Sequence, residues 1–433
     1  MTTESTAAPT AQRAAGLRTG LTSVDRALSP LSLKWLGWAI AATPALITAY
    51  LLIHRLHGHV GTNQPIGTDL VVYWSASREL LMHQPVYASH IFVYPPGSLL
   101  LFWPLGLLNL RGAVASFFVV DAAAILLAGV LMFRLFSLPL RSPQGAVTLF
   151  LFVSAMPVQT TLFNGNVNGL ILLLFSGYLL LASRQQWARA ALCLGASFAV
   201  KPILIAVALV FGLRRRWPSL LIALGFPVIV CLAVLPLLVD GAGFVTQAVP
   251  LLVGGDGPTY QGYNVSLAGT AASLHAPSLA VLSMRALVLV AAAVVGWRRA
   301  RRHDDVPLLV VELSGLLGLL TLLDSSFAWP YYTIYLLPLF VSVFRKGSFV
   351  RSVPAMVGFF LMLSPDILLM QAPHYDNAGG IADILFRLSL VRQTVGMLLL
   401  LGAIAWHEWR NRSRRTVLVP SIHLGQREAM PLG

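Results

Sequence analysis

The chain has 433 residues, of which 57% are hydrophobic and 11% charged, and several apolar runs reach the ~18 residues that cross a bilayer. A formal net charge of +14 is compatible with a nucleic-acid-binding protein. However, the basic residues fall in short clusters between apolar runs, which is the pattern of the positive-inside rule. Composition and charge therefore exclude nucleic acid as a partner and predict an all-α, polytopic membrane protein.

The two ends of the chain differ in composition from its middle. Residues 1–32 are rich in Ala, Thr, Ser and Arg and lack an apolar core, which predicts a disordered cytoplasmic tail and no signal peptide. Residues 33–410 contain the apolar runs and form the predicted membrane domain, and residues 411–433 form a basic cytoplasmic tail. Both cysteines, Cys193 and Cys231, lie within apolar runs, so neither predicts a disulfide or a metal site.

The first predicted span covers residues 35–53, and the basic residues before it place the N-terminus in the cytoplasm and the loop from His54 outside. In that loop Thr68 is expected to cap a helix that begins near Asp69. The residues that follow at helical spacing predict an amphipathic helix lying flat on the outer membrane surface. They are Leu70, Tyr73, Trp74, Ser77, Leu80 and Leu81.

The sequence Tyr94-Pro95-Pro96-Gly97 predicts a turn, and the apolar run after it ends near Asn109. That run is too short to cross ~30 Å of hydrocarbon at ~1.5 Å per residue. It is therefore interpreted as a re-entrant helix. A full span is predicted next, over residues 113–136.

Spans over 146–162 and 167–181 flank the polar turn Asn164-Gly165-Asn166-Val167-Asn168-Gly169, which must face outward because arginines follow the second span. The next apolar segment, 188–213, is interrupted by Lys201-Pro202 and has arginines at both ends. If both ends are cytoplasmic, the segment is a broken hairpin whose tip carries Lys201 toward the outer side. A single proline-kinked helix is the competing interpretation, and we expect the hairpin.

The remaining apolar runs alternate between outward and inward crossings, with arginine-rich loops inside and longer or more polar loops outside. The chain thus has about ten predicted full spans plus two shorter broken elements, or about 10 to 12 transmembrane helices. The remaining predicted spans are 219–239, 278–297, 307–323, 331–344, 354–370 and 390–406.

Polar residues gather on the predicted outer side, and ionisable side chains within a membrane are costly and generally functional. Asp69 is suited to act as general base toward an acceptor hydroxyl, although the helix dipole also favours an acid in a first turn. Lys201 lies within an apolar run and would be satisfied by a phosphate; a snorkelling or structurally paired lysine is the alternative. The other outward polar residues are Tyr73, Tyr87, Tyr94, Asn164, Asn166, Asn168, Asp256, Tyr260, Tyr263, Asn264, Ser266, Asp324, Trp329, Tyr331, Tyr332, His374 and Asp376.

Several of these positions also have an ordinary structural explanation. The turns that contain Tyr94 and Asn164 are suited to hold sugar hydroxyls or simply to reverse the chain. Asp256 and Asn264 belong to an external loop of flexible composition that is suited to act as a lid. Asp324 ends an apolar run, either as a site residue or as a surface acid.

Two clusters resemble metal ligands by composition alone. They are His303-Asp304-Asp305 and His407-Glu408, and both abut arginine clusters at the predicted cytoplasmic face. Solvated charge is the better interpretation of both, so no metal site is predicted, and a requirement for a divalent metal is left open.

The order of these motifs resembles that of membrane glycosyltransferases of the GT-C type, family 87-like, which take a sugar from a polyprenyl phosphate. The resemblance covers roughly residues 67–400, and within it the chain looks most similar to the actinobacterial arabinofuranosyltransferase C group. The motifs that carry it are Asp69 with Tyr73 and Ala76, Tyr94-Pro95-Pro96-Gly97, Asn164 to Gly169, Lys201-Pro202, and Asn264 with Ser266 and Gly269.

This resemblance implies an inverting enzyme of the plasma membrane that moves arabinofuranose from decaprenyl-phospho-arabinofuranose to arabinan, as an α(1→3) branch made at the external face. It implies no cofactor besides this lipid-linked donor, and partners that are membrane lipid and an arabinan or glycolipid acceptor. By position, Asp69 would activate the acceptor and Lys201 would bind the donor phosphate. The remaining substrate-binding candidates are Tyr94, Asn164, Asn168, Asn264, Asp256, Asp324, Tyr331 and Tyr332.

Two alternatives remain. Related polyprenyl-phosphomannose-dependent mannosyltransferases carry a Trp-x-His pattern where this chain has Trp329-Pro330-Tyr331-Tyr332, which weakens the mannosyltransferase interpretation. A lipid or sugar transporter is the second alternative. Such a protein is expected to show an internal repeat and broken helices that meet at the midplane, and the two halves of the chain show no convincing repeat.

Overall fold

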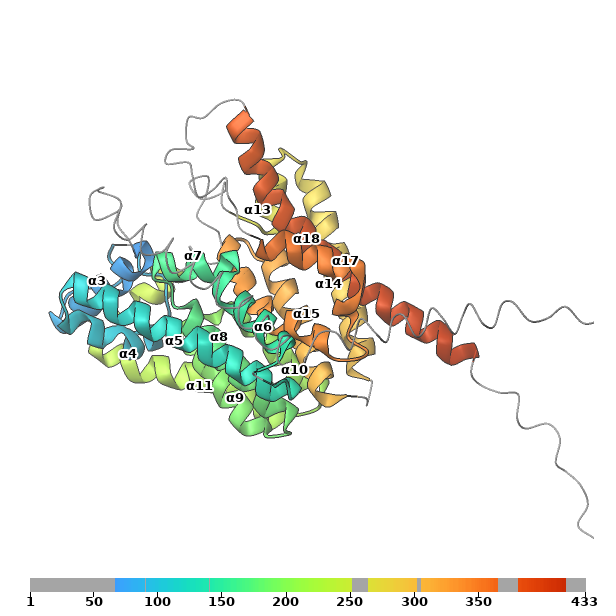
Figure 1. Ribbon diagram of the computed structural model, residues 1–433. Helices are drawn as coiled ribbons and strands as arrows, with labels where there is room; N and C mark the ends of the chain where they lie inside the picture. The colour runs from blue at the N-terminus through green and yellow to red at the C-terminus, as the bar shows by residue number, and fades with distance from the viewer. Residues whose placement is uncertain are drawn as a thin grey trace, which may run out of the picture.

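The computed structural model describes residues 67–89, 91–139, 141–250, 264–301, 305–364 and 381–417. Every regular element within these ranges is a helix, which confirms the predicted all-α class (Figure 1). The predicted first span over 35–53 lies outside the described residues, and so does the N-terminal tail.

Four helical stretches of the described chain are long and apolar enough to cross a membrane. A fifth span results if α6 (Pro143–Ser154) and α7 (Met156–Asn164), which are bent by 41° relative to each other, count as one. The predicted 10 to 12 spans are therefore not confirmed, because several of the expected spans are short helices. The four stretches are α5 (Leu110–Phe136), α11 (Trp217–Val234) with its continuation to Leu237, α14 (Ser278–Ala300) and α15 (Val306–Asp324).

The segment around Lys201 is a hairpin. Helix α9 (Trp187–Val200) ends at Lys201, and the chain continues through η3 (Pro202–Ala208) and α10 (Leu209–Leu213). The ring centroids of Trp187, at the start of the segment, and Phe211, at its end, lie 6.1 Å apart. A nearly straight helix would separate them by about 36 Å at ~1.5 Å per residue. The predicted hairpin is therefore confirmed, and the kinked single helix is wrong.

Helix α3 (Thr68–Leu81) is the predicted amphipathic helix, and it packs on the short run from η1 (Pro96–Ser98) through α4 (Leu99–Phe102) to η2 (Trp103–Leu107). The expected cap at Thr68 is wrong, because the helix already begins at that residue. Its N-cap is Gly67, which has the left-handed conformation, with φ of 75°, that glycine adopts without steric cost.

The other helices pack around these elements. Helix α8 (Asn168–Ser183) lies between α5 and α9, and α9 also packs on α11, whereas α14, α15 and α18 (Ile381–Val417) form the other part of the molecule (Figure 1). Short helices connect or extend them. They are η4 (Leu235–Leu237), η5 (Phe244–Ala248), α13 (Leu267–Ser273), η7 (Pro330–Leu336), α16 (Leu337–Val341), η8 (Ser342–Phe344), η9 (Phe349–Arg351) and α17 (Val353–Leu363).

A buried ion cluster joins α14, α15 and α18. The Arg299 guanidinium forms an ion pair with Glu312, and its Nη1 lies 3.3 Å from Glu408 Oε1. All three residues are buried. The interpretation of Glu408 as a solvated charge is therefore wrong, because helix packing removes it from solvent and pairs it with an arginine 109 residues away in the sequence.

Candidate functional site

One side-chain amide connects the predicted base to the predicted phosphate-binding lysine. Asn166 Nδ2 donates to Asp69 Oδ2 over 2.6 Å. The other end of that amide, Asn166 Oδ1, accepts from Lys201 Nζ over 3.4 Å. Asp69 and Lys201, which are far apart in the sequence, thus belong to one cluster.

Two glycines with positive φ allow the start of α3 to approach the turn between α7 and α8. Gly67 has φ of 75° and donates its N–H to the carbonyl of Phe163 over 3.2 Å. Gly165 has φ of 63°, and a Cβ added there would lie 2.9 Å from Leu70 Cβ. Because only a residue without a side chain permits this approach, the two glycines place Asp69 against Asn166.

Lys201 is buried among amide oxygens and aromatic rings. Its ammonium donates to Asn168 Oδ1 over 3.1 Å and lies 4.3 Å from the centre of the Tyr332 ring and 5.6 Å from that of Tyr94. The ion pairs within the described part of the chain do not include Lys201. A buried cation whose direct contacts are neutral groups is suited to bind an anionic ligand.

The Asp69 carboxyl is partly buried, and this desolvation raises its pKa above the ordinary value of an aspartate. The hydrogen bond from Asn166, the positive charge of Lys201 and the hydrogen bond from Tyr331 lower the pKa, but they only partly offset the effect of burial. A carboxylate with a raised pKa is a stronger proton acceptor, which suits a general base.

Tyrosines from three parts of the chain complete the cluster. Tyr331 donates its hydroxyl to Asp69 Oδ2 over 3.3 Å, and Tyr335 donates to Asn168 Oδ1 over 2.7 Å. The hydroxyls of Tyr73 and Tyr94 lie 2.8 Å apart. These contacts hold the amide and carboxylate oxygens in defined orientations.

The structure brings six of the predicted site residues together. The six are Asp69, Lys201, Tyr94, Asn168, Tyr331 and Tyr332. Asp256 lies outside the described residues.

The remaining three predicted site residues are Asn164, Asn264 and Asp324. Asn164 is the last residue of α7, and it is Asn166, two residues further along the chain, that contacts Asp69. The side chain of Asn264 donates to the carbonyl of Ser326 over 2.8 Å and accepts from the N–H of Ala328 over 2.9 Å. Asp324 pairs with Arg285 over 2.6 Å. The substrate-binding roles expected for these three residues remain predictions.

Asn166 and Tyr335 are cluster residues that the sequence did not single out as site residues. Asn166 was only one of several polar residues expected to face outward, and its position as the bridge depends on the packing of α3 against the turn. Tyr335 had a usable signal, because it follows Tyr331 by four residues, a spacing that places two side chains on one face of a regular α-helix.

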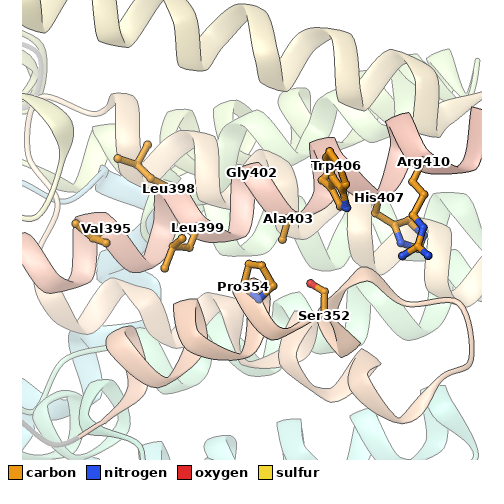
Figure 2. Close-up of a pocket in the computed structure, with 10 residues that line it drawn as sticks. All are labelled: Ser352, Pro354, Val395, Leu398, Leu399, Gly402, Ala403, Trp406, His407 and Arg410. Carbon is orange, nitrogen blue, oxygen red and sulfur yellow. The ribbon is translucent and has the colours of Figure 1, made fainter.

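A cavity of about 420 Å³ lies between α17 and α18 and shares no residue with this cluster (Figure 2). Its walls are mostly apolar, with Trp406, His407 and Arg410 toward one end. The chemistry-bearing side chains are gathered around Asp69 instead, so that cluster is the candidate site. Within the described ranges, no group of three His, Cys, Asp or Glu side chains is placed to hold a metal ion.

Comparison with known proteins identifies one family and several relatives. Residues 92–325 match the model of glycosyltransferase family 87. An alpha-(1->3)-arabinofuranosyltransferase of Mycobacterium tuberculosis H37Rv is 32% identical over 321 residues, which cover 71% of this chain and 73% of the relative. The enzyme of the same name from Corynebacterium glutamicum is 28% identical over 355 residues, or 79% of this chain and 82% of the relative.

A relative with a different name also matches. It is a polyprenol-phosphate-mannose-dependent alpha-(1-2)-phosphatidylinositol pentamannoside mannosyltransferase of Mycobacterium tuberculosis CDC 1551. It is 30% identical over 297 residues, which cover 63% of this chain and 65% of the relative. No solved structure matches the chain.

Proposed function

Because the chain belongs to glycosyltransferase family 87 and is therefore a membrane glycosyltransferase, we propose that it transfers arabinofuranose from decaprenyl-phospho-arabinofuranose to arabinan. The new bond is an α(1→3) branch, made with inversion at the external face of the plasma membrane. The names of the arabinofuranosyltransferase relatives, at 27 to 32% identity, support this donor sugar and linkage.

The proposed reaction uses Asp69 as general base. Its carboxylate takes the proton of the acceptor 3-hydroxyl while that oxygen attacks the anomeric carbon of the donor. The bond from the anomeric carbon to the phosphate oxygen breaks with its electron pair, and decaprenyl phosphate leaves. Tyr331 and Asn166, which both donate to Asp69 Oδ2, orient the carboxylate for this step.

Lys201 binds the donor phosphate in this proposal and stabilises the charge that builds up on the leaving group. Preorganised positive charge of this kind is a large source of rate acceleration in group transfer. The single observation that carries the proposal is that the Asn166 amide contacts both Asp69 and Lys201. The proposed base and the lysine proposed to stabilise the leaving phosphate are therefore close enough to act on one sugar.

Transfer of mannose from a polyprenyl phosphate is the second candidate, and the mannosyltransferase relative supports it. Against it, the chain has tyrosines after Trp329, where the related mannosyltransferases have the Trp-x-His pattern. One of these tyrosines, Tyr331, contacts Asp69, and the other, Tyr332, lies over Lys201. The positions that differ from the mannosyltransferase pattern thus lie next to the proposed base and the proposed phosphate-binding lysine. This difference favours a donor sugar other than mannose.

The test is transfer of radiolabelled sugar in membranes that contain the protein, with synthetic decaprenyl-phospho-arabinofuranose and decaprenyl-phospho-mannose offered separately. We expect label in the arabinan acceptor from the arabinose donor only. Asp69→Asn should lower the rate by about 10²-fold or more, since general-base catalysis contributes about 10²–10⁴-fold. Glu79→Gln is the matched control, because Glu79 lies on the same helix outside the cluster. Transfer from the mannose donor alone, or full activity of Asp69→Asn, would overturn the proposal.

A further inference from the structure

Asp121 is a buried acid that the proposed reaction does not use. It lies in the middle of α5, an apolar helix that is long enough to cross the membrane, and is only 1% exposed. A carboxylate at such a position is costly, so a specific interaction is expected to retain it. The ion pairs among the described residues do not include it.

The partner of Asp121 is the beginning of another helix. Its Oδ1 accepts from the backbone N–H of Leu170, in the first turn of α8, over 3.1 Å. The N-cap residue of α8 itself, Val167, provides no side-chain cap. Asp121 therefore supplies from α5 the acceptor that a capping residue ordinarily supplies from the same helix.

Gly169 makes this contact possible. A Cβ added at Gly169 would overlap the Asp121 carboxylate, so only glycine lets α8 approach α5 this closely. The carboxylate and the glycine together determine where the first turn of α8 lies.

The residue before Gly169 belongs to the candidate site. Asn168 Oδ1 accepts from Lys201 over 3.1 Å and from Tyr335 over 2.7 Å. The backbone N–H of Asn168 donates to Asn166 Oδ1 over 3.2 Å, the same oxygen that contacts Lys201. A shift of the first turn of α8 would therefore move both amides that hold the lysine.

We propose that Asp121 is a positioning residue for the donor phosphate: by holding the first turn of α8 against α5, it sets the position of Asn166 and Asn168 and, through them, of Lys201. It touches neither substrate nor the reacting atoms. This inference rests on the proposed function, because it assumes that Lys201 binds the phosphate of a lipid-linked sugar.

The test compares variants of the purified full-length protein in detergent. Asp121→Leu removes the acceptor at similar volume, Asp121→Asn keeps an oxygen that accepts, and Gly169→Ala displaces the carboxylate without altering it. Gly177→Ala is the matched control on the same helix, because a Cβ there would meet only Cys193 Sγ at 3.6 Å. The measurements are KM for the donor, KM for the acceptor, and binding of decaprenyl phosphate by thermal shift.

We expect Asp121→Leu and Gly169→Ala to raise the donor KM and to weaken decaprenyl phosphate binding by about tenfold, because a buried N–H is left without its acceptor. The acceptor KM should stay the same, and both Asp121→Asn and Gly177→Ala should remain within about threefold of wild type. A purely structural role would instead lower the melting temperature and leave the donor KM of the folded protein unchanged.

The outcomes separate this inference from the proposed function. If the wild-type protein transfers sugar and the Gly169→Ala protein has an unchanged donor KM, the positioning role of Asp121 is wrong and the proposed function stands. If the wild-type protein transfers no sugar from either donor, the proposed function is wrong. Decaprenyl phosphate binding by the variants then decides the role of Asp121 by itself, and equal binding by Gly169→Ala and Gly177→Ala rejects it.

Discussion

The ammonium group of Lys201 lies 4.3 Å from the centre of the Tyr332 ring, so a buried positive charge rests on an aromatic face beside two asparagine oxygens. A cation over a ring gains about 2 kcal/mol when it is desolvated, and the direct contacts of this ammonium are with neutral groups. The lysine thus keeps its capacity to pair with an anion that arrives with the substrate.

Replacing this lysine should impair donor binding selectively. We expect Lys201→Met to reduce kcat/KM for the lipid-linked donor by about 10- to 100-fold, the loss of one hydrogen bond to a charged group. Lys201→Arg should retain part of the activity, since it keeps the charge with a different geometry. Donor titrations at saturating acceptor provide the measurement, and an unchanged donor kcat/KM in Lys201→Met would rule out phosphate binding by this residue.

The acidic limb of the pH–rate profile should move when Asn166 is truncated. As a base, Asp69 must be deprotonated, so the rate rises as the pH increases through the Asp69 pKa. The hydrogen bond from Asn166 lowers that pKa, which burial has raised. Asn166→Ala should therefore shift the acidic limb to higher pH. A limb at the same or a lower pH in the variant would show that the titrating group is not Asp69.

The approach of α3 to the turn between α7 and α8 should depend on Gly165. Gly165→Ala introduces a Cβ 2.9 Å from Leu70 Cβ in a left-handed conformation. We expect a loss of roughly 1–3 kcal/mol of stability and a marked loss of transfer activity, because Asp69 moves away from Asn166. Gly225→Ala is the control, since nothing lies within 4 Å of a Cβ added there. Thermal melting in detergent and sugar transfer are measured in parallel; full activity of Gly165→Ala would contradict this arrangement.

The ion cluster around Arg299 should matter for stability and not for the reaction. Arg299→Met removes the guanidinium that pairs with both Glu312 and Glu408, and breaking a buried pair in this way costs about 3–5 kcal/mol. We expect a clearly lowered melting temperature. The neighbouring Arg298→Met should melt like the wild type, because Arg298 is exposed. Equal melting of the two variants would mean that the cluster contributes little.

Sidedness can be tested with single cysteines. His83, in the exposed turn after α3, is predicted to face outward, and Arg215, after the hairpin, is predicted to face the cytoplasm. We expect a membrane-impermeant maleimide to label His83→Cys in intact cells and Arg215→Cys only after permeabilisation. The parent protein for this experiment carries Cys193→Ser and Cys231→Ser. Labelling of both positions in intact cells would show that both face outward, which would contradict the predicted topology.

The amino-acid sequence by itself determined the class of the protein and the chemistry-bearing residues. Long apolar runs leave helices as the accessible structure in a bilayer, so the all-α membrane class follows from composition alone. Asp69 and Lys201 stood out because a charge next to or within an apolar run requires an explanation. The break at Lys201-Pro202 similarly marked the hairpin, since proline cannot continue the hydrogen bonding of α9.

Only the tertiary structure decided which polar residues meet. Asn166 contacts Asp69 across 97 residues of sequence because two glycines let α3 approach a turn, and no local pattern encodes that approach. Asp324 was also a candidate because it ends an apolar run, but packing of α14 against α15 gives it Arg285 as a partner. Periodicity and composition describe each segment separately, whereas the contacts between segments depend on side-chain packing and on where the backbone permits close approach.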